Sequence, residues 1–196
     1  MTRVQVFGVL SAILVPQTNW QFVARDHFVV DTGLRAGVRI SHISNSFRKR
    51  FLDGAGKIED RHEGAVLSYA KLLMPSIDGA VFAELGGEAE VETNLWQAFH
   101  LMSKQPHGEE DTLLIAKETM VGSGNIFYIR DQFGELACVQ ITWHPSGWHV
   151  SCWDVTTERS KWNEWEFGNQ IFFPRPQVAH NVAQLERNLP AAKFGS

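Results

Sequence analysis

The segment from residue 125 to residue 155 constrains the fold of this chain more than any other part of the sequence. It contains three runs in which apolar and polar side chains largely alternate, residues 126–130, 136–143 and 148–155, separated by short turn-forming segments. Alternation with a period of two residues is typical of β-strands, and short connections join strands that are antiparallel neighbours. The pattern therefore predicts a three-stranded antiparallel meander, with Gly134 in its first turn.

A hairpin loop over residues 144–147 sets Trp143 opposite Trp148 and so fixes the pairing of the last two strands. One face of this hairpin is then apolar and consists of Val139, Ile141, Trp143, Trp148, Val150 and Cys152. The second face consists of Cys138, Gln140, Thr142, His149, Ser151 and Trp153. A shift of the register by one residue would mix the two faces, so burial of the apolar face selects this pairing.

Reactive side chains are frequent in this hairpin, but the predicted register keeps them apart. Cys138 and His149 share a face, yet they are separated by two same-face steps, on the order of 10 Å. Cys152 lies on the opposite face. A nucleophile and its base must approach to about 3–4 Å, so no catalytic residue is predicted. The spacing of His and Cys matches no metal-binding motif, and neither a metal nor a cofactor is predicted.

Residues from distant segments leave an enzymatic alternative open. Cys138 together with His100 or His180 would make the chain a Cys- or His-dependent hydrolase or transferase. The sequence alone does not show whether these residues meet, so the enzyme stands as the alternative hypothesis.

The rest of the chain contains further predicted strands and helices. The predicted strands are residues 27–31 and 38–43, with a glycine-containing turn between them, and residues 170–173. The predicted helices are Ser44 or Ser46 to Leu52, residues 94–105, residues 160–165 and residues 177–188. Residues 68–74 fit either a helix or a strand.

Together these elements predict an α+β fold in a single globular domain over residues 1–193. Its antiparallel β-sheet combines the C-terminal three-stranded meander with an N-terminal hairpin, and helices pack on one face of the sheet. The chain has 196 residues, of which 44% are hydrophobic, and this is enough to bury a substantial core.

Residues 4–15 form an apolar segment near the N-terminus. The segment is shorter than the roughly 20 residues that span a bilayer, and no small-residue cleavage site follows it. We interpret it as a buried strand or short helix of a cytoplasmic protein without a transmembrane segment. The alternative is a secreted protein in which residues 1–16 act as a signal peptide.

Five of the seven tryptophans fall between residues 143 and 165. Aromatic rings beside hydrogen-bonding side chains are how proteins commonly hold peptides and other ligands. We therefore predict a non-enzymatic binding protein whose partner is a peptide or protein. The predicted ligand-binding residues are Gln140, Thr142, His149, Ser151, Trp153, Trp162 and Trp165. The competing interpretation is that Trp153, Trp162 and Trp165 form a minor core over the second face of the sheet.

The basic run Arg48–Arg50 offers a third hypothesis, weak nucleic-acid binding. The chain carries a net charge of −4, which gives no general attraction to a phosphate backbone. Nucleic acid is therefore not the expected partner, and the sequence leaves the oligomeric state open.

Overall fold

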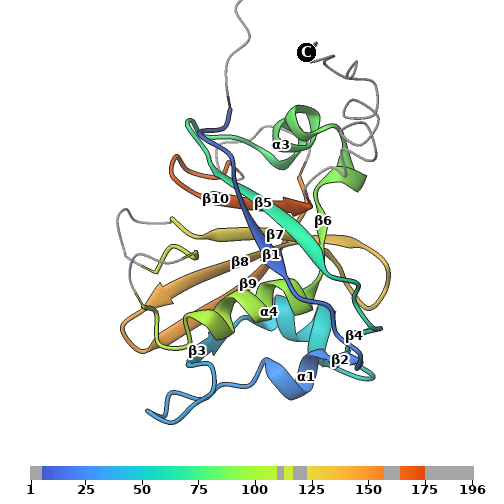
Figure 1. The fold of residues 1–196 in the computed structure, drawn as a ribbon, viewed down its shortest axis with the longest axis vertical. Helices are drawn as coiled ribbons and strands as arrows, with labels where there is room; N and C mark the ends of the chain where they lie inside the picture. The colour runs from blue at the N-terminus through green and yellow to red at the C-terminus, as the bar shows by residue number, and fades with distance from the viewer. Residues whose placement is uncertain (1–5, 110–112, 117–122, 157–163, 175–196) are drawn as a thin grey trace, which may run out of the picture.

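The computed structural model describes residues 6–109, 113–116, 123–156 and 164–174, which form a mixed α+β structure (Figure 1). An eight-stranded, mostly antiparallel sheet has the order β1-β5-β10-β7-β8-β9-β3, with β6 beside β7. Its strands are β1 (Ser11–Val15), β3 (Ile40–Ile43), β5 (Ala65–Lys71), β6 (Glu92–Thr93), β7 (Asn125–Arg130), β8 (Leu136–His144), β9 (Gly147–Asp154) and β10 (Gln170–Pro174). A separate pair consists of β2 (Phe22–Val23) and β4 (Ile58–Glu59).

Few helices accompany the sheet. They are α1 (Ala24–His27), α2 (Asn45–Phe47) continued by a π-helical turn (Arg48–Leu52), α3 (Asp78–Leu85), a 3₁₀ turn (Glu88–Glu90) and α4 (Leu95–Lys104). The predicted α+β class with a mostly antiparallel sheet is therefore confirmed. Among the described residues, no helix is both long and apolar enough to cross a bilayer.

The pairing predicted for residues 125–155 is confirmed. β7 pairs with β8 and β8 with β9, both antiparallel, and Trp143 lies opposite Trp148 as the apolar face requires. The hairpin loop is shorter than predicted, because His144 pairs with Gly147 and only two residues lie between them. This difference leaves the two faces unchanged.

The predicted N-terminal hairpin is wrong. His27 ends α1 instead of opening a strand, and β3 pairs in parallel with β9. Residues 27–31 contribute only an isolated bridge between Asp31 and Ile40. Val29 and Val30 are exposed, so this segment has strand propensity but no buried apolar face that would stabilise it as a strand.

Gly147 is what allows β3 to approach β9 so closely. It adopts a φ of 137°, and a Cβ there would lie 2.7 Å from the carbonyl oxygen of Arg39. That same carbonyl accepts the N–H of Trp148 at 2.7 Å. Only glycine fits this backbone contact without displacing the edge strand.

The sheet is covered on both faces, whereas the sequence predicted helices on one. Phe127 and Ile129 of β7 face a core cluster that includes α4 residues such as Leu101. Ile126 and Tyr128 face a second cluster that includes residues of α3. A central strand that is apolar on both sides must be covered on both sides, and α3 supplies the second cover.

Several other elements agree with the sequence pattern. The helix predicted over residues 94–105 is α4, and Asn94 caps its first turn in a reciprocal capping box with Gln97. Ser44 caps α2 by accepting the N–H of Phe47. Residues 170–173 belong to β10, and the ambiguous segment 68–74 contributes to β5. The helix predicted over 177–188 and most of the one over 160–165 lie outside the described residues.

The N-terminal apolar segment contributes β1 to the sheet. Phe7 and Val15 are buried, and Ile13 packs against the core on the α4 side. Leu10 and Leu14 are exposed, so within β1 only the face that carries Ile13 and Val15 is buried.

Candidate functional site

The predicted binding residues of the hairpin share one face of strands β8 and β9. We call Gln140, Thr142, His149, Ser151 and Trp153 the meander face. Trp153 is 54% exposed, and the other four side chains are half-buried. Trp148 on the same strand is fully buried on the opposite face. Trp162 lies outside the described residues.

Two further histidines extend the meander face, and we call His42, His149 and His144 the imidazole row. β3 places His42 beside His149, with the ring centroids 5.2 Å apart. His144 stacks on the other side of His149 at 3.8 Å, with 13° between the ring planes. The sequence pattern does not point to His42, because it predicts a different partner strand for residues 38–43. It does not point to His144, because this residue is predicted to lie in the hairpin loop.

The surroundings of His149 favour the neutral form of its ring. Burial lowers the pKa of His149 below its usual value, and the neighbouring His144 and His42 lower it further. The His144 and His149 rings stack on each other instead of pointing their nitrogens at a common centre. In the part of the chain that the structure describes, no group of three or more His, Cys, Asp or Glu residues is arranged to hold a metal ion.

The other end of the same sheet face is closed by α3 and Trp165. Asp78, the first residue of α3, is buried, and one of its carboxylate oxygens accepts the hydroxyl of Tyr128 at 2.7 Å and the indole N–H of Trp165 at 2.6 Å. Its second oxygen accepts the backbone N–H of Thr156 at 2.8 Å. Trp165 is half-buried against this core. The structure thus places Trp165 in a packed region and Trp153 in an open one.

Both cysteine side chains are buried and free of a disulfide. Burial raises the pKa of the Cys138 thiol well above its usual value, and it raises that of Cys152 to about 12. Cys138 belongs to the core on the α3 side, whereas His100 lies on α4, which packs on the other face of the sheet. His180 lies outside the described residues. A thiol with a raised pKa is a poor nucleophile, so this geometry does not favour the Cys-dependent alternative.

We therefore expect the native protein to react slowly with a thiol reagent such as dithiobis(nitrobenzoic acid). At neutral pH the rate should be at least about a hundredfold below that of free cysteine, because little thiolate is present and access is blocked. In denaturant both thiols should react at once, and a Cys138→Ala variant should then release a single equivalent. One thiol that reacts rapidly in the native protein would contradict this expectation and favour the enzyme.

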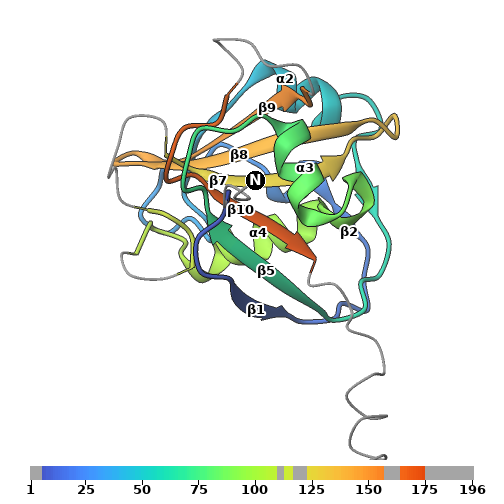
Figure 2. The ribbon, with the colours of Figure 1, turned by 90° about the horizontal axis from the view of Figure 1, so that it is seen from above.

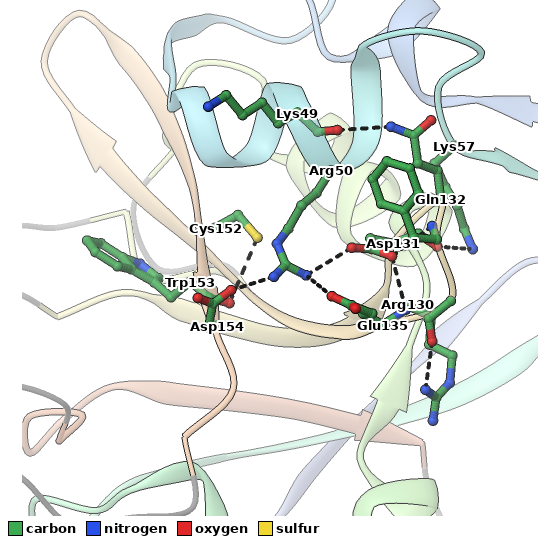
Figure 3. Close-up of polar contacts among 12 residues, drawn as sticks. Lys49, Arg50, Lys57, Arg130, Asp131, Gln132, Glu135, Cys152, Trp153 and Asp154 are labelled. Carbon is green, nitrogen blue, oxygen red and sulfur yellow. Dashed lines mark hydrogen bonds and ion pairs between the residues drawn. The ribbon is translucent and has the colours of Figure 1, made fainter.

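The basic run Arg48–Arg50 lies in the π-helical turn, next to the β7–β8 turn (Figure 3). The guanidinium of Arg50 donates to Asp131 at 2.9 Å and to Asp154, and it lies 3.8 Å from Glu135. The side chain of Gln132 donates to the backbone carbonyl of Lys49 at 2.9 Å. Three carboxylates therefore already surround Arg50, the last charge of this run, which argues against a shared phosphate-binding site.

Comparison of the chain with protein-family models, with curated proteins and with solved structures finds no match. The case for a function therefore depends on the geometry of the molecule.

Proposed function

We propose that this chain is a non-enzymatic binding protein that holds a peptide or protein partner on the meander face. The observation that carries the proposal is the exposure of Trp153, which is 54% exposed near the end of the ordered strand β9. A large indole left in water is unfavourable unless it serves a contact, and tryptophan is strongly enriched at the centres of protein interfaces.

The composition of the surface supports the same proposal. None of the side chains in the meander face and the imidazole row carries a permanent charge, and the rings of the row are flat and polarisable. Interface centres are depleted in charged residues, because a buried charge must be desolvated. The hydroxyl and imidazole groups that continue this surface along β8 and β9 from Trp153 can orient a peptide through hydrogen bonds.

The shape of the surface favours an extended partner over a small molecule. The meander face lies on two adjacent long strands, β8 and β9, and the imidazole row continues it onto β3. Adjacent strands offer a broad, nearly flat area, whereas small ligands are usually held in concave pockets.

The test replaces Trp153 by alanine. Peptides are first selected from a random dodecapeptide library on the immobilised full chain, and their affinities are then measured by fluorescence titration. Trp153→Ala should weaken a selected peptide by about 30-fold, which corresponds to a central hot-spot residue. The melting temperature should stay within about 2 °C, because the side chain packs against little of the core.

Phe133→Ala is the matched control. Phe133 is an exposed aromatic residue in the β7–β8 turn and does not belong to the meander face, so its loss should leave peptide affinity unchanged. Trp165→Ala is unsuitable as a control, because losing the bond to Asp78 would lower the stability of the fold. If no peptide is selected, or if selected peptides bind Trp153→Ala as tightly as the wild type, the proposal is wrong.

A further inference from the structure

Strand β1 forms one edge of the sheet, and its outer side has no strand partner among the described residues (Figure 2). Its inner side pairs with β5 from Ser11 to Val15. The opposite edge is β3, and it is partly covered. Asp31, in the segment before β3, exchanges two backbone hydrogen bonds of 2.9 and 3.0 Å with Ile40 of β3. The unpaired N–H and C=O groups of an edge strand can bind another strand.

The large exposed side chains at this edge are apolar, and the exposed Ser11 and Ala12 of β1 are small. Leu10 is 61% exposed and Leu14 is 70% exposed. Leu14 lies opposite Val66 of β5, which is exposed as well, so the apolar surface continues onto the second strand.

The edge also lacks the charged side chains that usually prevent an edge strand from pairing with a strand of another molecule. Natural edge strands often carry lysine or another charged residue, which makes pairing with a further strand unfavourable. The sequence contains no charged residue between Arg3 and Arg25. Nothing in β1 itself therefore opposes the approach of another strand.

We propose that β1 pairs with β1 of a second copy of this chain, antiparallel and about a two-fold axis at Ala12. In this register Leu10 of each copy lies opposite Leu14 of the other, because the two leucines are equally distant from Ala12 in the sequence. The small Ala12 side chains meet at the axis. This self-complementarity is what an isologous interface requires, and it favours a second copy over an unrelated partner. The surface is separate from the meander face, so the inference does not rest on the proposed function.

The contact between the copies is short. Five strand residues extend over about 17 Å, and the interface therefore falls at the small end of specific protein contacts. The dimer is in equilibrium with the monomer, and the average mass of the protein depends on its concentration.

The experiment measures the mass of the full chain by sedimentation equilibrium from about 5 to about 500 μM, the range that suits a weak dimer. The wild-type mass should rise from that of the monomer towards that of the dimer. Leu10→Lys/Leu14→Lys and Leu10→Glu/Leu14→Glu should each remain monomeric, because like charges face each other across the axis.

The register gives two sharper expectations. A mixture of the double-lysine and double-glutamate variants should form dimers, because every introduced lysine then faces a glutamate. Leu10→Lys/Leu14→Glu should dimerise by itself for the same reason. Leu34→Lys, which changes an exposed leucine in the loop before β3, should associate like the wild type.

Two results would overturn the proposal. The first is a wild-type mass that stays monomeric over the whole range, and the second is a double-lysine variant that still dimerises, which would place the interface elsewhere. If the wild type is monomeric and the double-lysine variant melts several degrees lower, another part of the same chain covers β1.

Discussion

Asp78→Ala is expected to lower the free energy of unfolding by about 3–4 kcal/mol, because three buried or half-buried donors lose their acceptor. The carboxylate joins α3 to the hydroxyl of Tyr128, to the indole of Trp165 and to the backbone N–H of Thr156. These partners come from three other parts of the chain, so one side chain secures the whole α3 side of the sheet. Urea denaturation at neutral pH measures the loss.

Two variants control this prediction. Asp78→Asn keeps one acceptor oxygen for Tyr128 and Trp165 but turns a donor towards Thr156, so we expect about half of the loss. Asp26→Ala removes an exposed aspartate from α1 and should change the free energy of unfolding by less than about 0.5 kcal/mol. A loss below about 1 kcal/mol for Asp78→Ala would contradict the assigned role.

The pH dependence of the Asp78 contribution gives an independent check. Burial raises the pKa of Asp78 above its usual value, and its hydrogen bonds to Thr156, Trp165 and Tyr128 only partly oppose this effect. The folded protein therefore holds the Asp78 proton more tightly than the unfolded chain does. The stability from this group is fully present below the unfolded pKa of about 3.9, and it declines as the pH rises through the folded pKa. The stability difference between wild type and Asp78→Asn should accordingly shrink over this interval.

Asp131→Ala is expected to cost about 3–5 kcal/mol, the range observed when one partner of a buried ion pair is removed. The Asp131 side chain is only 1% exposed and accepts from Arg50 at 2.9 Å. It also accepts the backbone N–H groups of Phe133 at 2.8 Å and Glu135 at 3.0 Å, which shapes the turn between β7 and β8. The substitution removes both the ion pair and the support of the turn.

Glu135→Ala is the matched control for Asp131. Glu135 approaches the same guanidinium at 3.8 Å, but its side chain is 72% exposed. Solvent screens such a pair, so its loss should cost no more than about 0.5 kcal/mol. Equal effects of the two substitutions on the denaturation midpoint would show that the Arg50 cluster contributes through overall charge and not through the buried bonds of Asp131.

The sequence predicted those parts of the fold whose pattern is local. The register of β8 and β9 followed from alternation and from a short loop, because only one pairing buries the whole apolar face. α4 followed from apolar residues at helical spacing and from the stop signal at Pro106, whereas the structure shows that Asn94 caps it. β7 and β10 were also predicted, since both are short apolar runs that end at a turn signal or a proline.

The interior of the candidate site was harder to predict. Trp153 and Trp165 look alike in the sequence, but only the structure shows that one is exposed and the other is bonded to Asp78. Two contacts of the site join segments that are far apart in the sequence. His149 contacts His42 of β3, and the chain around Thr156 caps α3. A helical or alternating pattern carries no information about which distant segment will supply them.

The sequence by itself determined which residues of the last hairpin share a face. It placed Cys152 on the face opposite His149, and it placed Cys138 on the same face two steps away from His149. It also determined the absence of charge along β1, because composition needs no coordinates. The tertiary structure alone decided that β3 joins β9 in parallel, that α3 covers the second face and that Trp153 stays in water. These outcomes depend on which apolar faces remain uncovered after the local elements have formed. Segments far apart in the chain compete to cover those faces, so the result is a property of the assembled molecule.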